Sequence, residues 1–461
     1  MLGRDRLLAA LFALQLGVAA VLGGFLVSAL REDSRPTSLA QQPAQQPTVQ
    51  GPVPSGSAQP LAATPGSGGT RTTTTTTTSG GSHGGGAVAN PTGADTKVVP
   101  AGAPIKVGAV VSQTGAISFV SSAQATKAYF DLVNRKGGVN GHKIVLDLRD
   151  DQLDSARGRQ QAQQLIASGV FAFTGFNAPV TEPGIVPMLE QNKIPLIGGY
   201  GEQEEYHTPW AYIFSASYGH FGFQMGSYLA EQGVKKPGLI YINNNSAKAN
   251  DGLVAAFKAG FRSKGVTLAD NEIVVVDVTK PSYDDVVTQF KLDGVDGMAT
   301  LLDQTAYNRL NQAQDRQAYH PKHAASPLFV DPTVKQSSNT DGTFVASDFD
   351  FVDGGGPAVQ EYVQTVKAAY GSRASINYFG QQGWIDAKIF VAAVAKLGNT
   401  ITRDALLKTM DSLDGKGGFG FSSDLRFGPG VRDLNRCLKF AKVVQGKATR
   451  VTDWRCDEQP F

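Results

Sequence analysis

Strand-like and helix-like segments alternate along this chain from Ile105 to about residue 335. The β-rich run 105–111 comes first, and a helical periodicity over 123–134 follows it. The turn Gly137-Gly138-Val139-Asn140-Gly141 then leads into a second strand over 143–148, because glycine suits a helix C-cap and Asn-Gly suits positive φ. Strands that alternate with helices form parallel sheets covered on both faces, so the pattern predicts an α/β fold.

The same alternation restarts near residue 222, which predicts two successive open α/β units. The further strands are expected over 171–174, 195–197, 238–242, 272–278, 297–301, 328–330 and 343–346. The further helices are expected over 155–167, 180–191, 222–232, 253–264, 283–291, 307–314, 358–370, 383–397 and 403–410. From Gly417 onward the chain has the pattern of a small β meander.

The N-terminal segment 1–31 has the composition of a membrane anchor or a signal peptide. Its stretch 7–30 is nearly all apolar and follows Arg4 and Arg6, and its length is near the ~20 residues that span a bilayer. The basic side is expected to stay cytoplasmic, which places the rest of the chain outside, at the cell surface. Val27-Ser28-Ala29 also fits a signal-peptidase site, so both alternatives stay open, with an uncleaved transmembrane helix slightly favoured.

Residues 32–103 are typical of a disordered linker. The segment is rich in Pro, Gln, Gly, Ser and Thr, includes the run Thr72–Thr78, and has almost no periodic apolar face. Such a segment cannot bury enough surface to offset its ordering entropy. It is either a spacer that carries a globular domain away from a membrane or an unselected disordered tail.

Composition excludes several classes of function. The net charge is +2 and no dense basic stripe occurs, so no nucleic-acid partner is predicted. The only cysteines are Cys437 and Cys456; this excludes a CxxC metal site, and in an exported protein the pair predicts a disulfide. Neither a P-loop nor an HExxH motif is present, no GxSxG elbow follows a predicted strand, and no GxGxxG opens the first βα unit. We therefore expect no enzyme, no cofactor and no metal.

An ordered set of short motifs then gives a more specific indication. These are Ser112-Gln113-Thr114-Gly115, the turn over 137–141, Asp150-Asp151, Pro195-Leu196-Ile197 and the flap over 417–421. Over about 105–455 this order resembles type I periplasmic binding proteins, the extracytoplasmic solute-binding components of ABC importers, in the leucine/isoleucine/valine-binding family.

The resemblance implies a fold with two lobes. Each lobe would be an open parallel sheet flanked by helices, with a hinged cleft between them. Lobe one would comprise about 105–215 plus 340–415, and lobe two about 216–339 plus 416–461, with the first crossing near 214–217. The implied function is capture of a small solute by hinge closure and delivery to permease subunits of an ABC importer. The alternative is a membrane-anchored sensing module that signals on closure without transport.

Ligands of open α/β sheets bind beyond the carboxyl ends of the strands, near helix N-termini. The candidate ligand-binding residues at those positions are Gln113, Phe119, Asn177, Ala178, Tyr200, Gly201, Glu202, Ser246, Asp303 and Asp331. Here the chain departs from the family, because loops 176–181 and 198–203 lack the usual hydroxyl clamp for an α-amino acid. We therefore expect weak binding of leucine, isoleucine and valine, and a solute that is amino-acid-like, an amide or another polar metabolite. The acidic candidates would suit a cationic or polyhydroxylated ligand, on which Tyr200 and Phe119 would stack.

Several of these residues also have simpler interpretations. Glu202 would be solvated beside Glu204 and Glu205, and Asp331 before Pro332 would form a turn. Asp150 and Asp151 suit turns and helix caps better than ligand contacts.

Overall fold

The computed structural model describes residues 88–89, 91–242, 247–268, 273–276, 280–336 and 340–459, with the backbone alone over 247–251 and 273–276. The predicted membrane segment (1–31) and most of the predicted linker lie outside the described residues. Among the helices that are described, none combines the length and apolarity that a membrane crossing requires.

One end of the predicted linker is part of the folded unit. Val99 is partly buried against the core, and its backbone N–H donates to the carbonyl oxygen of Ile401 at 2.9 Å. The backbone N–H of Asp404 donates to the carbonyl oxygen of Asp95 at 3.3 Å. The folded part therefore begins about ten residues before Ile105, where the sequence places its start.

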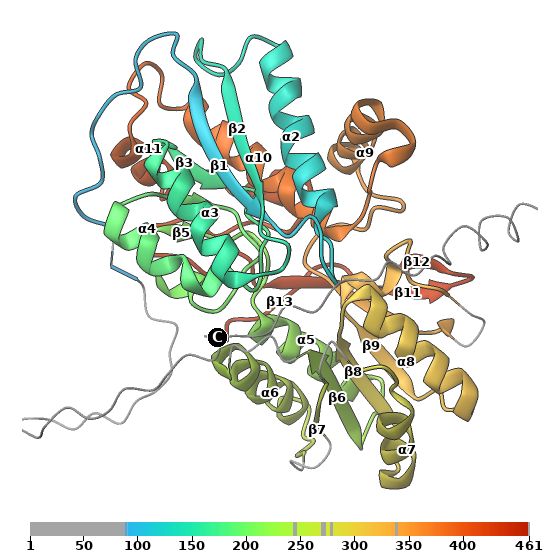
Figure 1. The fold of residues 1–461 in the computed structure, drawn as a ribbon. Helices are drawn as coiled ribbons and strands as arrows, with labels where there is room; N and C mark the ends of the chain where they lie inside the picture. Colours follow the sequence, from blue (N-terminus) through green and yellow to red (C-terminus); the bar gives the residue numbers. More distant parts are fainter. Residues whose placement is uncertain are drawn as a thin grey trace, which may run out of the picture. The chain divides into compact units, whose positions relative to one another are not determined.

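The first sheet is entirely parallel in the described part of the chain (Figure 1). Its strand order is β2-β1-β3-β4-β5. The strands are β1 (Ile105–Val111), β2 (Ile144–Asp150), β3 (Ala172–Thr174), β4 (Leu196–Ile197) and β5 (Ala211–Tyr212). The helices around it are α2 (Val120–Arg135), α3 (Ser155–Ala167), α4 (Val186–Asn192), α9 (Pro357–Tyr370), α10 (Tyr378–Ala395) and α11 (Arg403–Met410). We call this sheet with its helices lobe one.

The second sheet, with its helices, forms lobe two. Over the described residues its order is β12-β11-β10-β9-β8-β6-β7, and β13 pairs with β11. The strands are β6 (Pro237–Ile242), β7 (Ile273–Val276), β8 (Gly297–Leu301), β9 (Lys322–Ala325), β10 (Phe344–Ser347), β11 (Cys437–Val444), β12 (Lys447–Arg450) and β13 (Arg455–Cys456). The helices are α5 (Tyr218–Glu231), α6 (Ala247–Arg262), α7 (Asp284–Asp293) and α8 (Gln304–Gln317). Strands β6 to β10 are parallel, as expected, but β11, β12 and β13 add an antiparallel extension.

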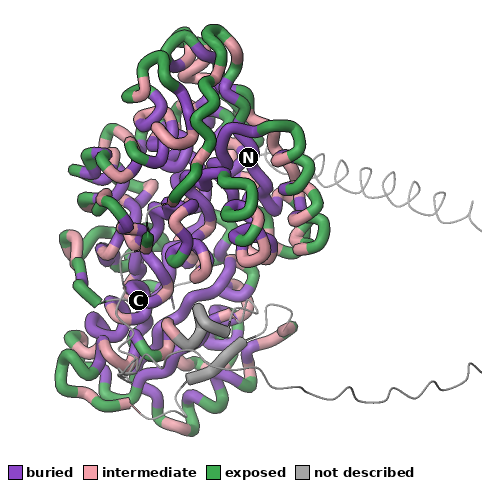
Figure 2. Tube along the Cα trace, turned by 90° about the vertical axis from the view of Figure 1, so that its left-hand side faces the viewer, coloured by how far each residue is buried: buried purple, intermediate pink, exposed green. Residues whose placement is uncertain are grey.

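Strand order explains how the helices cover both faces of each sheet. From β1 the chain moves to β2 at one edge of the first sheet. From β2 it then moves to β3, β4 and β5 in turn, toward the opposite edge. Because parallel crossovers are right-handed, α2 covers one face and α3 and α4 cover the other. Lobe two repeats the arrangement, with α6 on one face and α7 and α8 on the opposite one. Buried chain accordingly runs through the interior of both lobes (Figure 2).

Glycines allow a very close contact between α5 and α6. A Cβ atom on Gly226 would lie 2.4 Å from the carbonyl oxygen of Phe257, and one on Gly260 would lie 2.3 Å from that of Phe223. Since real Cβ atoms do not approach so closely, only glycine lets these two helices pack backbone to backbone.

Three crossings of the described chain connect the lobes, and one buried side chain joins all three. The crossings follow β5, follow β10, and precede β11. Asn435, in the third crossing, donates from its side-chain amide to the carbonyl oxygen of Phe214 in the first (3.2 Å) and of Asp348 in the second (3.3 Å). The Asp348 carboxylate in turn accepts from the backbone N–H of Ala216 at 2.8 Å. The first crossing therefore lies where the sequence predicts it, near 214–217.

Two of the predicted lobe boundaries are wrong. Strand β10 lies between β9 and β11, so residues 340–347 belong to lobe two and not to lobe one. Conversely, Phe421, Leu425 and Leu434 pack in the core of lobe one, so the chain from 416 to 434 belongs there. Residues 417–434 hold no strand of the predicted meander, whose strands begin at Cys437. The strand expected over 328–330 is instead a 3-10 turn (Pro327–Val330).

The remaining local predictions concern the turn and the cysteines. Asn140 (φ 48°) and Gly141 (φ 80°) adopt the positive φ expected of the turn between α2 and β2. Cys437 lies opposite Cys456 in the β11–β13 pairing, and the two are disulfide-bonded. In the core of lobe one, Trp384 of α10 is fully buried.

Candidate functional site

A cavity of about 230 Å³, which we call the inner cavity, lies between the two lobes. Lobe one lines it with Ile117, Phe119, Leu153, Pro179, Val180, Tyr200, Gly201, Tyr378 and Phe379. Lobe two lines it with Tyr218, Phe221, Tyr241, Ile242, Leu253, Leu301, Leu302, Asp303, Ser326, Pro327 and Leu328, and the first crossing adds Ser215 and Ala216. Apolar and aromatic side chains therefore make up most of its described wall.

Strand ends and helix starts bring these side chains together. Tyr241 and Leu301 stand at the carboxyl ends of the parallel strands β6 and β8. Tyr218 begins α5, Tyr378 begins α10, and Asp303 is the N-cap of α8. The site thus occupies the position that open α/β sheets reserve for ligands.

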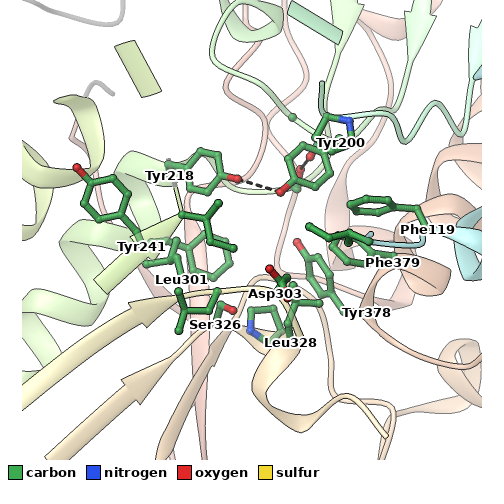
Figure 3. Close-up of a pocket in the computed structure, with 18 of the residues that line it drawn as sticks. Phe119, Tyr200, Tyr218, Tyr241, Leu301, Asp303, Ser326, Leu328, Tyr378 and Phe379 are labelled. Carbon is green, nitrogen blue, oxygen red and sulfur yellow. Dashed lines mark hydrogen bonds between the residues drawn. The ribbon is translucent and has the colours of Figure 1, made fainter. Parts of the chain in front are cut away.

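Four aromatic rings form a connected group in the wall of the inner cavity. The ring of Phe119 meets that of Phe379 at 4.4 Å between centroids and that of Tyr200 at 5.6 Å, both edge to face. Tyr200 stacks on Phe379 at 6.0 Å, and Tyr378 meets Phe379 at 5.4 Å. In Figure 3 the hydroxyl groups of Tyr200 and Tyr218 point toward each other, with 3.0 Å between their oxygens. This hydrogen bond joins lobe one to lobe two.

Polar groups in the described wall are few. Asp303 is the one charged residue among them, and its side chain is only 6% exposed. Its Oδ1 accepts from the backbone N–H of Ala306 at 2.9 Å, as an N-cap should. Burial raises the pKa of Asp303 despite that hydrogen bond. Ser215 and Ser326 contribute the alkyl hydroxyl groups.

Buried carboxylates shape two loops of lobe one. Glu182 accepts from the backbone N–H groups of Ala178 (3.0 Å), Tyr200 (3.0 Å) and Gly201 (3.3 Å) and so connects loop 176–181 to loop 198–203. Burial and the neighbouring charge of Glu205 raise the pKa of Glu182 well above its usual range. These loops consequently present Pro179, Val180, Tyr200 and Gly201 to the cavity, and no hydroxyl clamp.

Asp150 has a comparable role in loop 112–119. It accepts from the backbone N–H of Gln113 at 3.0 Å and from the hydroxyl of Thr114 at 2.7 Å. Burial acts to raise the pKa of Asp150, but these hydrogen bonds and that from Gln152 hold it below its ordinary value. Asp151 accepts from Thr181 at 2.7 Å. Both aspartates therefore hold loops in place.

The structure brings four of the ten candidate ligand residues to the inner cavity: Phe119, Tyr200, Gly201 and Asp303. Asp331 lines a second cavity at the mouth of the cleft. Four further candidates do not line the inner cavity, namely Gln113, Asn177, Ala178 and Glu202. The tenth, Ser246, lies outside the described residues. Asn177 is fully buried and donates to Ser122, and Glu202 is buried and not solvated beside Glu204 and Glu205.

Asp331 uses its carboxylate within the protein. Its Oδ1 accepts from the backbone and hydroxyl of Thr333, and its Oδ2 accepts from Asn377 at 2.8 Å and Gln304 at 3.3 Å. Asn377 belongs to lobe one, so Asp331 connects the lobes at the mouth of the cleft. The structure thus assigns it a third role beside the turn and the ligand contact considered from sequence.

Sequence reasoning missed the apolar lining. Apart from Phe119 and Tyr200 it favoured polar groups at strand ends, and so passed over Tyr218, Tyr241, Leu301 and Tyr378. The same rule of strand ends and helix starts selects them once further aromatic and aliphatic residues are admitted: Tyr378 follows the N-cap Asn377, and Tyr218 follows the N-cap Ser217.

Comparison with known proteins agrees with this geometry. A family model described as periplasmic binding protein matches residues 104–448, about three quarters of the chain. The chain belongs to this family. Membership in the periplasmic binding protein family implies a location outside the cytoplasm.

A curated relative supports the assignment over a shorter stretch. The Leu/Ile/Val-binding protein BraC3 of Rhizobium johnstonii is 24% identical over 179 residues, which is 37% of this chain and 48% of the relative. The chain therefore spans about half the length of the curated relative it matches.

Solved structures of periplasmic binding proteins share the fold. A fatty acid ABC transporter substrate-binding protein from Thermomonospora curvata has a TM-score of 0.67 at 18% identity, covering 80% of this chain and 97% of its own. A branched-chain amino acid ABC transporter protein from Thermus thermophilus with bound valine has a TM-score of 0.68 at 16% identity, covering 77% and 96%. A solute-binding protein from R. palustris in complex with benzoate has a TM-score of 0.65 at 15% identity, covering 77% and 98%.

Proposed function

We propose that this protein is the solute-binding component of an ABC importer, and that it captures a small, mainly apolar solute by closing its two lobes around it. The observation that carries the proposal is the inner cavity, whose described wall is mainly aromatic and aliphatic and comes from both lobes. Ligand pockets of this kind, apolar with few convergent polar groups, favour a solute with a ring or a short chain.

The cavity changes the class of solute expected from the sequence. The sequence favours a polar metabolite, because the candidate residues are mostly polar. In the structure many of those polar groups support loops, and Phe119, Tyr200 and Phe379 face the solute site in their place. We therefore infer a solute whose body is apolar.

Closure is the proposed mechanism of capture. Contacts already connect the lobes across the cleft: Leu328 of lobe two packs against the cluster of Phe119 and Phe379 in lobe one. A solute that touches both lobes binds the closed form better than the open form, and that difference in affinity shifts the equilibrium. The crossings that Asn435 joins would supply the hinge, since a few residues there absorb the change in dihedral angles.

Two experiments test the proposal. A thermal-shift screen of the full-length protein should find stabilisation by apolar ring-bearing or chain-bearing solutes, of about 2.7 kcal/mol at 100 times the dissociation constant. Uptake of the strongest binder should then fall in a strain that lacks this gene. Binding with unchanged uptake would contradict transport and favour the sensing alternative, whereas stabilisation only by sugars or other polar solutes would contradict the apolar site.

A further inference from the structure

The interlobe cleft has two compartments, and one carboxylate lies at their junction. A second cavity of about 530 Å³, the outer cavity, opens beside the inner one, and the two share Ile117 and Asp303 in their walls. The outer wall also includes Gln304, Asp331 and Arg373. Any solute that fills the inner cavity and extends outward must therefore pass Asp303.

The described wall of the inner cavity carries negative charge only, although the charge of Arg309 behind the wall acts on Asp303. In its described wall Asp303 is the one charged group. Burial raises the pKa of Tyr200, and the charge of Glu202 adds to the effect. Burial also raises the pKa of Tyr378, and the charge of Asp348 adds to that effect. The Oδ2 atom of Asp348 lies 3.4 Å from the Tyr378 hydroxyl oxygen. Two further carboxylates therefore lie behind the rings, and the site favours positive charge over negative.

Three tyrosines line the cavity together with this carboxylate. Figure 3 shows Asp303 among the labelled residues, with Tyr200 and Tyr218 above it and Tyr378 beside it. Ring faces attract cations through their quadrupole, and aromatic cages bind quaternary ammonium ligands in this way.

We propose that the solute is an organic cation, an amine or quaternary ammonium compound with an apolar body, whose charge binds between Asp303 and the rings of Tyr200, Tyr218 and Tyr378. This inference rests on the proposed function and specifies its solute class. The apolar body occupies the inner cavity, and the charged group lies at the junction of the two compartments.

The energetic reason is the incompletely balanced burial of Asp303. A carboxylate that is 6% exposed loses most of its hydration, and the backbone N–H groups of Ala306 and Thr305 together with the charge of Arg309 offset only part of that cost, since burial still raises its pKa. A bound ammonium group supplies the opposite charge in a site that water has left, where charge pairs are strongest. A carboxylate ligand in the same place would face Asp303 without a cation in the described wall.

Arg373 does not reverse this preference. It is the one cation in the described wall of the outer cavity, and it lies on the exposed turn before α10. Exposed ion pairs contribute little because water and salt screen them. The buried carboxylate therefore decides the sign of the preferred charge.

Three probes of nearly equal size test the inference by calorimetric titration of the full-length protein at pH 7. The probes are 2-phenylethylammonium, 2-phenylethanol and phenylacetate. The cation should bind about tenfold more tightly than the alcohol, from ring and charge contacts together, and phenylacetate should bind most weakly. Equal or tighter binding of the alcohol or of phenylacetate overturns the inference and leaves the proposed function standing. Binding of none of them, with no shift for any apolar solute in the screen, overturns both.

A single substitution tests the role of the carboxylate. Asp303→Asn keeps the N-cap of α8, since Asn caps helices about as well as Asp. It should lower the affinity for 2-phenylethylammonium about tenfold and leave that for 2-phenylethanol within about threefold. Asp293→Asn, at the exposed end of α7, is the matched control and should change neither. If Asp303→Asn does not fold, the ranking of the three probes on the unmodified protein decides alone.

Discussion

The hydroxyl oxygens of Tyr200 in lobe one and Tyr218 in lobe two lie 3.0 Å apart across the solute cavity. Each tyrosine belongs to a segment that its own lobe fixes: Tyr200 follows β4, and Tyr218 is the first residue of α5. The hydrogen bond can therefore form only when the lobes approach, and it gives the closed form a specific stabilising contact.

Removal of this contact should weaken solute binding without damaging the fold. Tyr218→Phe deletes one hydrogen bond of the closed form. A hydrogen bond contributes about 0.5–1.5 kcal/mol, so its loss should raise the dissociation constant roughly three- to tenfold. Titration of the strongest solute from the screen measures the change. Tyr129→Phe, whose ring packs on Trp384 away from the cavity, is the control. Unchanged affinity in Tyr218→Phe would show that the pair has no part in closure.

Asn435 should be essential for the stability of the crossings. Asn435→Leu removes both amide hydrogen bonds and leaves the carbonyl oxygens of Phe214 and Asp348 without those donors. Each buried group left unsatisfied costs about 1–3 kcal/mol. Urea unfolding should show this loss, whereas Asn192→Leu on the exposed end of α4 should stay within about 0.5 kcal/mol. A loss no larger than the control would mean that other contacts hold the crossings.

His220 predicts a specific pH dependence of stability. It lies buried between Asp457 (2.8 Å) and Asp433 (3.0 Å), and although burial acts to lower its pKa, the hydrogen bonds and charges of these two carboxylates raise it to about 9. A raised pKa means that the folded state holds its proton more tightly than the unfolded state. The stabilisation of the folded state by protonated His220 is therefore complete below pH 6.5. It is lost as the pH rises toward 9, which lowers the free energy of unfolding by at most about 3 kcal/mol.

Denaturant unfolding at pH 6, 7.5 and 9 measures that dependence. The free energy of unfolding should fall over this range in the unmodified protein, and His220→Gln should remove this part of the fall. His207→Gln changes an exposed histidine and should keep it. The same slope in both variants would refute the assignment.

The helix pair α5 and α6 offers a matched test of close packing. Gly226→Ala places a methyl group 2.4 Å from a backbone oxygen, and such overpacking costs about 1–3 kcal/mol. Gly252→Ala, in the middle of α6 with no atom within 4 Å of the new methyl group, should be neutral or slightly stabilising. The melting temperature should therefore fall in Gly226→Ala and stay the same or rise slightly in Gly252→Ala. Equal melting temperatures in the two variants would argue against the close contact.

Leucine should be a poor ligand. The loops that would hold its α-carboxylate and ammonium groups present Pro179, Val180 and Tyr200 to the cavity, and Thr181 donates its hydroxyl to Asp151. Leucine at 10 mM should leave the melting temperature unchanged while the best apolar solute raises it. A large shift with leucine would mean that the clamp is supplied by other residues.

The sequence predicts the scaffold well because the scaffold follows local rules. Helical periodicity, glycine at the end of α2 and Asn140-Gly141 in the turn each act over a few residues, so the βα order is visible without tertiary information. Lobe boundaries are not local: β10 resembles any short strand, and only its pairing with β9 and β11 assigns it to lobe two.

The site is predictable in position but not in chemistry. The rule of strand ends selects Phe119, Tyr200 and Asp303, which line the cavity. It does not reveal that Asn177 and Ala178 are used by hydrogen bonds inside lobe one, with Ser122 of the distant helix α2 and with the buried carboxylate of Glu182. Nor does it show that Tyr378, more than 170 residues after Tyr200, completes the same wall.

Capture of an apolar solute in the cleft is the central proposal, and one titration tests it directly. Ile117→Trp enlarges a side chain at the junction of the two cavities and should weaken the best solute from the screen at least about tenfold. Leu292→Trp, on a side chain 78% exposed on α7, should bind as the unmodified protein does. Equal affinity in all three proteins would place the solute elsewhere and contradict the account.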